Sequence, residues 1–334
     1  MRILAIRVGR VGDTVMITPA LNAILQSYPD AELTILASPE GKRVLQNFNP
    51  RIKNIWTWNR HSLLQSWRDK KRITQQSSLT KFDKIFCFDT SKSIAGLFTD
   101  LDTDFHWFKG ASALKHSARH YLDLVAASTG CDVESFYNHL PITANTQQQA
   151  DAELETYGIA KNDVLLMIHP TYSGYTRLGL TKRNARLHKL WPAKNYAELA
   201  RRLSVTRLEN GTLPKIFMEI VPAEHDYALK IIAASDNSIQ LLPSKRDFER
   251  YKALIARANV LLTPDSGPMH IASALGTRIV AMFSMKDPGD CGPYMPAELF
   301  TIIRKDDPAK GISAIDIDTA YNALIPLLNA SLKK

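Results

Sequence analysis

Short apolar runs alternate with amphipathic stretches along the whole chain. The runs are rich in β-branched residues and have the length of buried strands, whereas the stretches between them repeat apolar residues with helical spacing. Strands are predicted at 2–8, 32–37, 53–57, 84–88, 104–108, 163–169, 215–220, 238–242, 259–263 and 278–283. Helices are predicted between them, with further ones near 116–130 and 313–331. Strands and helices that alternate in this way favour an α/β fold with parallel sheets.

The length of the chain, 334 residues, suits two domains. A polar stretch from Thr143 to Gln149 marks the expected crossing point, so we expect one domain over 1–150 and a second over 151–312. No segment approaches the ~20 apolar residues of a membrane helix, and no signal or lipidation motif is evident. The three cysteines are scattered, without metal-binding spacing, which fits a reducing cytoplasm.

The last two predicted strands are joined by a loop and a helix with the character of a ligand site. Asp265, Ser266 and Gly267 stand at the carboxyl end of a strand, where open α/β sheets bind ligands, and the helix that follows ends at Gly276. The free backbone N–H groups of a helix start suit a phosphate. Ser266 can cap this helix, Gly267 lets an anion approach the backbone, and His270 can reach the same ligand. Alternatively, Asp265 and Ser266 are ordinary caps and His270 is a surface histidine.

The amino terminus repeats the order of strand, glycine loop and helix. Its glycines, Gly9 and Gly12, have neither the spacing of a dinucleotide fingerprint nor that of a Walker loop. Asp13 follows at the tip of the loop and faces the expected crevice of the sheet, where a carboxylate could accept a proton from a substrate hydroxyl. The alternative is that Asp13 caps the helix.

The net charge of +9 is concentrated between Lys42 and Lys84, where eleven lysines and arginines face only two aspartates. Tryptophans are interleaved with them. Three interpretations stand: a solvated basic face, an anionic lipid surface or acidic glycolipid acceptor, and nucleic acid. We favour the second over nucleic acid because no nucleic-acid-binding module accompanies the charge.

Several segments in a fixed order resemble the family 9 glycosyltransferases, the ADP-heptose:lipopolysaccharide heptosyltransferases. The first runs from Gly12 to Leu21 and contains Gly-Asp and a Thr-Pro-Ala-Leu turn. The second is Lys189-Leu190-Trp191-Pro192, which follows a strand and a small-residue loop. Glu224 comes after the next strand, and Asp265 to Gly276 is the last segment, with a Gly-Pro pair downstream. Two features depart from the family pattern: the long basic loop 174–188, and Ser284 where glycine is usual.

The resemblance implies the GT-B architecture, with two Rossmann-like domains that face a central cleft. The N-terminal domain would bind the acceptor and the C-terminal domain the nucleotide sugar, and the helix at 313–334 would pack back on the N-terminal domain. The implied donor is ADP-L-glycero-β-D-manno-heptose, and the implied acceptor is the phosphorylated lipid A–Kdo inner core of lipopolysaccharide. The enzyme would then be cytoplasmic and peripherally associated with the anionic inner leaflet of the inner membrane, without a nucleic-acid partner.

The resemblance also assigns roles to residues. Asp13 would be the general base of an inverting transfer, and Glu224 would hold the ribose. The residues expected to bind the donor are Thr171, Ser173, Lys189, Glu224, Asp265, Ser266, Gly267 and His270. The residues expected on the acceptor side are Gly12, Arg60, Lys70 and Arg72. No Asp-x-Asp pair stands at a strand end in the cleft, so neither a metal nor a cofactor is expected.

Other interpretations stay open at this point. Lys189 and Trp191 could simply begin a helix, Glu224 could be a first-turn acid, and His169 could be a strand-end histidine without a ligand role. The protein could also use another nucleotide sugar or acceptor, act as a GT-B-like sugar-nucleotide epimerase, or be a non-catalytic nucleotide- or lipopolysaccharide-binding protein.

Overall fold

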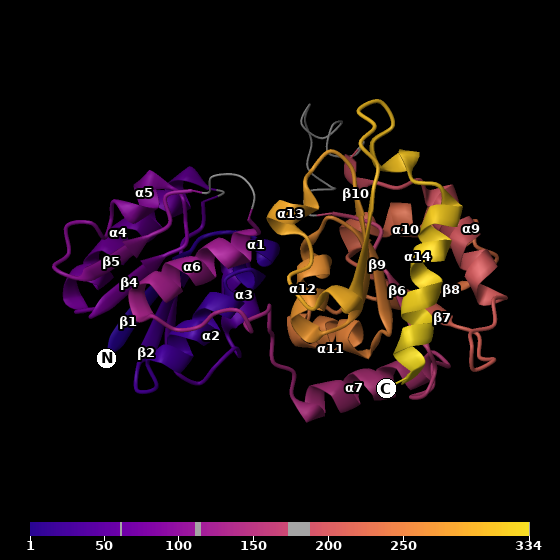
Figure 1. Ribbon diagram of the computed structural model, residues 1–334, viewed down its shortest axis with the longest axis horizontal. Coiled ribbons are helices and arrows are strands. Elements are labelled where there is room, and N and C mark those ends of the chain that lie inside the picture. The colour runs from indigo at the N-terminus through magenta and orange to yellow at the C-terminus, as the bar shows by residue number, and fades with distance from the viewer. Residues whose placement is uncertain (61, 111–114, 173–187, 334) are drawn as a thin grey trace. The chain divides into compact units, whose positions relative to one another are not determined.

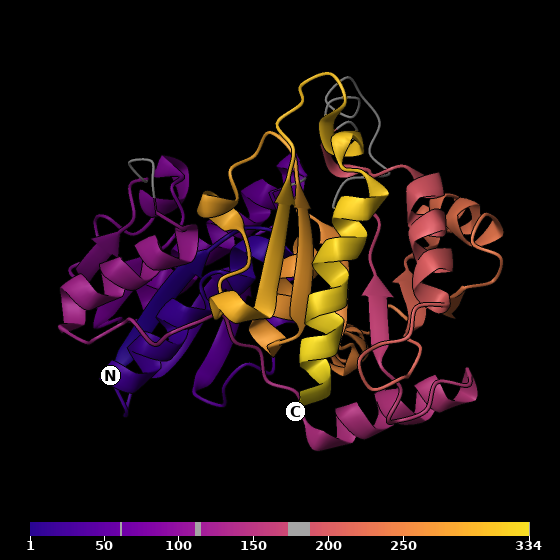
Figure 2. The ribbon, with the colours of Figure 1, turned by 45° about the vertical axis from the view of Figure 1, so that its right-hand side comes forward.

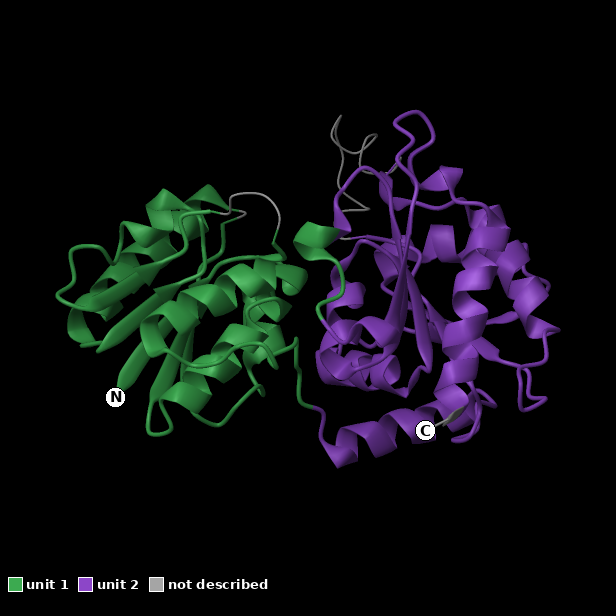
Figure 3. Cartoon of the chain, viewed as in Figure 1, with its two compact units in different colours: residues 1–141, 289–294 green, residues 142–288, 295–334 purple. Residues whose placement is uncertain are grey.

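The computed structural model describes residues 1–60, 62–110, 115–172 and 188–333. The chain forms two compact units (Figure 3). Unit 1 comprises Met1–Pro141 and Gly289–Tyr294, and unit 2 comprises Ile142–Pro288 and Met295–Lys334. The division at 141/142 corrects the expected boundary after residue 150. Its reason is helix α7 (Ala144–Thr156), which packs against α11 (Phe248–Arg257) of unit 2.

Unit 1 is built on a five-stranded parallel sheet in the order β3-β2-β1-β4-β5. The strands are β1 (Arg2–Arg7), β2 (Glu32–Ala37), β3 (Ile52–Thr57), β4 (Lys84–Cys87) and β5 (Asp104–Trp107). The helices are α1 (Val11–Val15), α2 (Thr18–Ser27), α3 (Pro39–Leu45), α4 (Leu63–Leu79), α5 (Lys92–Ala95) and α6 (Ser117–Thr129).

Helices cover both faces of this sheet (Figure 1). Residues 3–6 of the central strand β1 are fully buried, as a continuous apolar run requires when both faces are covered. Leu4 and Ile6 share one core with Ile73 of α4 and Ile94 of α5. Helices α2 and α6 pack against each other on the opposite face. The parallel strands place the ends of β1 and β4 at the same edge of the sheet.

Unit 2 is built on a six-stranded sheet in the order β11-β10-β9-β6-β7-β8, again with parallel neighbours. The strands are β6 (Leu165–Ile168), β7 (Lys215–Ile220), β8 (Ile239–Pro243), β9 (Val260–Pro264), β10 (Arg278–Phe283) and β11 (Phe300–Arg304). The longer helices are α7, α9 (Ala193–Ser204), α10 (His225–Ala233), α11, α12 (Gly267–Leu275) and α14 (Ile317–Ala330), and α13 (Pro288–Cys291) is short.

One core of unit 2 joins α9, α10 and α14 to the sheet, and helices α7, α11 and α12 contact one another in sequence. The central strands β9 and β10 are buried along their whole length. Trp191 is fully buried, and its indole N–H donates to the Ile315 carbonyl at 2.8 Å. Trp191 therefore fixes the chain just before α9 by core packing. This agrees with the alternative that Trp191 serves the start of a helix.

Two elements near the C-terminus complete unit 2. The C-terminal helix α14 contacts α9, β9, β10 and β11 of its own unit (Figures 1 and 2). Its apolar residues Ala320, Leu324 and Leu328 belong to the core of that unit, so burial of this side of the helix decides its place. Strand β11 was missed, although Phe300-Thr301-Ile302-Ile303 is an apolar β-branched run that pairs with the edge of β10.

Candidate functional site

The start of helix α12 is fixed by the residues on either side of it. Strand β9 ends at Pro264, and the amide N–H of Asp265 donates to the Met282 carbonyl of β10 at 3.2 Å. Gly276 ends the helix in the left-handed conformation, with φ of 71°, as the sequence predicts. The N-terminus of α12 thus lies at the carboxyl edge of the sheet, the edge at which such folds bind ligands.

Asp265 carries the strongest ion pair at this edge. Its carboxylate is buried, with 6% of the residue exposed, and accepts from Lys189 Nζ at 2.6 Å, while Lys286 Nζ lies 3.6 Å from the same oxygen. Lys189 Nζ also donates to the Asp265 carbonyl at 2.9 Å. Burial alone would raise the pKa of Asp265, but the charges of Lys189 and Lys286, with His270 nearby, hold that pKa below its usual value. The carboxyl is therefore ionised, and two cations face it.

The side chains around Asp265 differ in part from the sequence expectation. Ser266 occupies the N-cap position of α12, but its hydroxyl bonds to Thr263 Oγ1 at 2.8 Å and makes no capping bond. Ser266 therefore stands at the predicted cap position, but its hydroxyl bonds to the Thr263 hydroxyl and not to a backbone N–H of the helix. Gly267 is the first residue of the helix, and His270 is buried one turn in. The alternative of a surface histidine at 270 is excluded.

A directed chain of hydrogen bonds lies at the ends of β6 and β7. The Thr171 hydroxyl donates to Glu224 Oε2 at 2.7 Å and lies 3.2 Å from His169 Nε2. The Tyr251 hydroxyl lies 3.2 Å from His169 Nδ1. A hydroxyl has one hydrogen, so Thr171 must accept from His169 Nε2–H, and His169 Nδ1 must then accept from Tyr251. Every proton in the chain therefore points towards Glu224.

The electrostatics of this chain agree with that assignment. Burial lowers the pKa of His169 to about 4, which keeps the imidazole neutral near pH 7. Burial raises the pKa of Tyr251 well above its usual value, so its hydroxyl keeps the proton it donates. Burial also raises the pKa of Glu224, and the bond from Thr171 opposes that rise.

Thr171 itself has no exposed surface. Its hydroxyl contacts Glu224, and the role of Thr171 in donor binding stays a prediction. Glu224 ends a short 3-10 helix before α10 and stays partly exposed, and its side chain makes no capping bond there. The alternative of Glu224 as a first-turn acid agrees with its place in this 3-10 helix and at the N-cap of α10, and Thr171 in addition orients its carboxylate.

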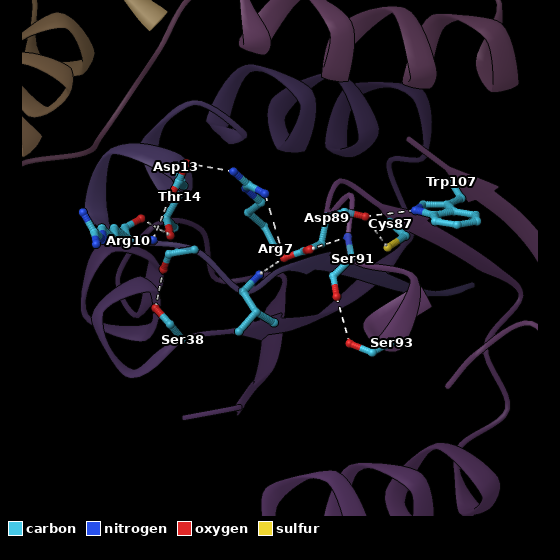
Figure 4. Close-up of polar contacts among 12 residues, drawn as sticks. Arg7, Arg10, Asp13, Thr14, Ser38, Cys87, Asp89, Ser91, Ser93 and Trp107 are labelled. Carbon is cyan, nitrogen blue, oxygen red and sulfur yellow. Dashed lines mark hydrogen bonds and ion pairs between the residues drawn. The ribbon is translucent and has the colours of Figure 1, made fainter. Parts of the chain in front are cut away.

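In unit 1, Asp13 lies in the first turn of α1, and hydrogen bonds hold both of its carboxylate oxygens (Figure 4). Oδ1 accepts from Arg7 Nη2 at 2.8 Å, and Oδ2 accepts from the backbone N–H of Arg10 at 2.9 Å. The second bond is that of a capping box, so the cap interpretation of Asp13 is confirmed. The side chain is nevertheless one-third exposed, at 33%, and each carboxylate oxygen has a further lone-pair site. The same carboxylate can therefore cap the helix and still accept a proton.

Arg7 connects Asp13 to a second, buried carboxylate (Figure 4). Asp89 follows β4, has 3% of its surface exposed, and lies 3.8 Å from Arg7 Nη1. Its oxygens also accept from the backbone N–H groups of Val8 at 3.2 Å and Ser91 at 2.9 Å. Asp89 thereby anchors the guanidinium that holds Asp13.

Gly9 is the glycine on which this geometry depends. A Cβ atom at position 9 would lie 2.4 Å from Asp13 Cβ and 2.8 Å from its Oδ2, closer than any real contact. The Gly9 carbonyl also accepts from Ser38 Oγ at 2.5 Å, which fixes the loop against the start of α3. The glycine is therefore required by close approach to Asp13.

The remaining predicted residues lie apart from these contacts. Gly12 lies in α1 and is partly exposed, and Arg60 and Lys70 are exposed. Arg72 donates to the Thr57 carbonyl at 2.6 Å and pairs with Asp69 at 3.1 Å, although half of its side chain is exposed. Ser173 and the loop 174–187 lie outside the described residues. The acceptor roles of these residues stay predictions.

Four residues of these sites were missed at the level of sequence. Arg7 and Asp89 stand at the ends of strands β1 and β4, and that position is the signal that could have found them. Lys286 comes three residues after β10, at the same edge as Asp265. Tyr251 lies within α11, and nothing in the sequence indicates that it reaches His169.

The architecture, two units that are each built on a parallel α/β sheet, is that of the GT-B class of glycosyltransferase folds. The family model of glycosyltransferase family 9 (heptosyltransferase) matches residues 105–310, and the chain belongs to this family. The "Lipopolysaccharide heptosyltransferase 2" of Escherichia coli (strain K12) is 30% identical over 155 residues, and the match covers 43% of each chain. The matched part of this chain therefore spans less than half the length of that relative.

Solved structures share the fold over nearly the whole chain. The family 9 glycosyltransferase of Veillonella parvula DSM 2008 superposes with a TM-score of 0.82, at 18% identity, and covers 100% of this chain and 97% of that one. The E. coli ADP-heptose lps heptosyltransferase II gives a TM-score of 0.75 at 17% identity, with 99% and 100% covered. The predicted fold class is confirmed.

Hydropathy along the helices bears on membrane contact. Among the residues that the structure describes, no helix combines the length and the apolar content that crossing a bilayer requires.

Proposed function

We propose that this protein is an inverting glycosyltransferase that transfers heptose from ADP-L-glycero-β-D-manno-heptose to the Kdo/heptose inner core of lipopolysaccharide. The observation that carries the proposal is the Lys189–Asp265 pair at the start of α12, with 2.6 Å between Nζ and Oδ2. It joins a cation, a helix N-terminus and an ionised carboxylate at one edge of a sheet. Those groups match a diphosphate attached to a polyhydroxylated sugar.

The donor diphosphate would lie on the first turn of α12. The backbone N–H of Gly267 and the positive end of the helix dipole favour its charge. Lys189 would turn from Asp265 to a phosphate oxygen, which leaves the Asp265 carboxylate able to accept from sugar hydroxyls. Glu224 would accept from the vicinal hydroxyls of the ribose, in the orientation that Thr171 imposes on it.

Asp13 of unit 1 would act as the general base. The acceptor hydroxyl attacks the anomeric carbon, a new C–O bond forms, and the bond from that carbon to the β-phosphate oxygen breaks. The hydroxyl proton passes to Asp13, and ADP leaves with the electron pair of the broken bond. A single displacement of this kind inverts the anomeric centre. Arg7 and the Arg10 amide keep the carboxylate in one orientation for the transfer.

The negative charge that grows on the leaving ADP would be stabilised by Lys189 and the start of α12. We propose that these groups suffice without a metal ion or another cofactor. The acceptor would be a phosphorylated lipid at an anionic membrane surface, and the exposed cations Arg60 and Lys70, with Arg72, would face it. A cytoplasmic protein held peripherally at the inner leaflet of the inner membrane would fit this acceptor.

Calorimetric titration with ADP, UDP and GDP, without added metal, tests the donor assignment. We expect ADP to bind more tightly than UDP or GDP, and the Lys189→Met variant to lose most of that affinity. Exposed Lys230 on α10 provides a matched control, since Lys230→Met should bind ADP like the wild type. Preference for UDP or GDP would replace heptose by another sugar, and no binding of any of the three would overturn the transferase proposal.

A further inference from the structure

The first half of helix α4 carries large apolar side chains on its outer surface. Leu63 is 93% exposed, Leu64 60% and Trp67 62%. The helix starts at Leu63, directly after Ser62, whose hydroxyl accepts from the Gln65 N–H at 3.4 Å. Exposed apolar side chains that gather in this way mark a contact surface more often than chance exposure does.

The opposite face of α4 holds the helix in one rotational setting. Ile73 is fully buried in the core of unit 1. Asp69 is buried and accepts from the backbone N–H of Asn59 at 2.8 Å, and the Ser66 hydroxyl accepts from the Trp58 indole at 2.9 Å. The helix cannot roll to hide its outer side chains without breaking these bonds.

The outer side chains form a strip flanked by cations. With ~100° of rotation per residue, Leu63, Trp67 and Leu64 fall within an arc of ~100° on the side away from Ile73. Lys71 lies inside this arc, with its Nζ 5.9 Å from the centre of the Trp67 ring. Lys70 falls on one border of the arc and Arg68 beyond the other.

The exposed charges of this segment have one sign. The cations from residue 60 to residue 72 are Arg60, Arg68, Lys70, Lys71 and Arg72. The one carboxylate in that range, Asp69, is buried and engaged with Asn59, Gln65 and Arg72. An apolar strip with a basic border has the chemistry of an interfacial helix on anionic lipid, because insertion and electrostatic attraction together give stable binding where either alone is marginal.

We propose that the first half of α4 docks this protein on an anionic lipid bilayer, with Leu63, Leu64 and Trp67 inserted between the headgroups. The inference rests on the proposed function only in taking the acceptor to be a membrane lipid, and it adds the element that makes the contact. Charge complementarity argues against a second copy of this chain, since the strip is bordered by cations alone, and the mixture of apolar side chains and cations matches the headgroup region of an anionic bilayer.

Vesicle co-sedimentation tests the proposal. The full-length protein is mixed with vesicles of phosphatidylcholine and phosphatidylglycerol, and with vesicles of pure phosphatidylcholine. We expect binding to the anionic vesicles, and a shift of tryptophan emission to shorter wavelength that disappears in Trp67→Phe. The double variant Leu63→Gln/Leu64→Gln should weaken binding at least about tenfold. The single variant Lys71→Gln should weaken it roughly fivefold.

Leu79 gives the matched control, since it is 79% exposed at the far end of the same helix. Leu79→Gln should bind vesicles like the wild type. Equal losses in Leu79→Gln and in the double variant, unchanged binding in the double variant, equal binding to neutral vesicles, or concentration-dependent self-association through α4 in place of lipid binding would each overturn the proposal. ADP titration of the same samples separates the two hypotheses: vesicle binding without ADP binding contradicts the transferase, and ADP binding without vesicle binding contradicts only the docking of α4.

Discussion

The pH dependence of nucleoside binding should reveal the hydrogen-bond chain that ends at Glu224. In the proposed complex the ionised Glu224 carboxylate accepts from ribose hydroxyls, so affinity falls as the pH drops through its pKa. Burial raises that pKa above its usual value, and the Thr171 hydroxyl, 2.7 Å from Oε2, opposes the rise. The variant Thr171→Val keeps the shape of the side chain and removes the hydroxyl, so the pKa of Glu224 should rise further.

The size of the effect follows from the bond. A hydrogen bond to a charged group contributes about 1.5–3 kcal/mol. Glu224 is partly exposed and keeps some hydration, so the lower end of that range applies. At about 1.4 kcal/mol per pKa unit, the acidic limb of binding should move up by about one pH unit in Thr171→Val. Thr171→Ser, which keeps the hydroxyl, should leave the limb close to its wild-type position.

Adenosine is the proper ligand for this measurement, because it lacks phosphates that ionise near pH 6. Its affinity is measured by NMR titration at a series of pH values, with thermal melting of each variant as a check on folding. Burial lowers the pKa of His169 to about 4 and raises that of Glu224, so a limb from His169 would lie at more acidic pH. The pKa of Asp265 is also lowered, so its limb lies at more acidic pH. An identical limb in wild type and in Thr171→Val, or a limb that persists in Glu224→Gln, would refute the reasoning.

Three shorter predictions concern the reaction itself. Asp13→Asn should reduce turnover by about 10²–10⁴-fold, the usual contribution of a general base, with little change in ADP affinity; wild-type turnover in a folded variant would remove Asp13 from this role. Gly9→Ala should reduce turnover as strongly, because its Cβ would lie 2.4 Å from Asp13 Cβ, and ADP calorimetry should show the donor site intact. Turnover should survive a metal chelator, since Lys189 and the helix start are proposed to stabilise the leaving ADP; a loss restored by added metal would contradict this.

The fold follows from the sequence wherever burial alone decides it. The ten predicted strands all occur, because runs such as 278–283 are buried on both faces and have no other stable place. Strand β11 was missed although it is as long as β9, which was predicted. A helix was predicted at about 313–331, and the structure has it at Ile317–Ala330, where it packs on the sheet of unit 2. An apolar face on a helix indicates that this face is buried. Which sheet covers it depends on the tertiary arrangement.

The candidate sites show the same limit at the scale of single side chains. Sequence position indicates which residues stand at the carboxyl edge of a sheet, and Asp13 and Asp265 were found in this way, whereas Lys189 came from the family resemblance. It does not indicate which of two neighbouring polar groups faces a ligand. The Thr171 and Ser266 hydroxyls both turn to internal partners. The partner of each hydroxyl depends on side chains that are distant in sequence or that compete locally. The periodicity of the sequence does not indicate these partners.

The two carboxylates central to the proposed reaction are each bound to a cation of their own unit. Asp13 is 2.8 Å from Arg7, and Asp265 is 2.6 Å from Lys189. The pairs differ in one respect that matters for chemistry. Arg7 is also close to the buried Asp89, so it stays with Asp13 while the carboxylate uses a remaining lone pair. Lys189 has a flexible stem and no second carboxylate in its described contacts, so a diphosphate can draw it away. The fixed Arg7–Asp13 pair thus suits a general base that must keep one orientation. The exchangeable Lys189–Asp265 pair suits a site that must bind an anion.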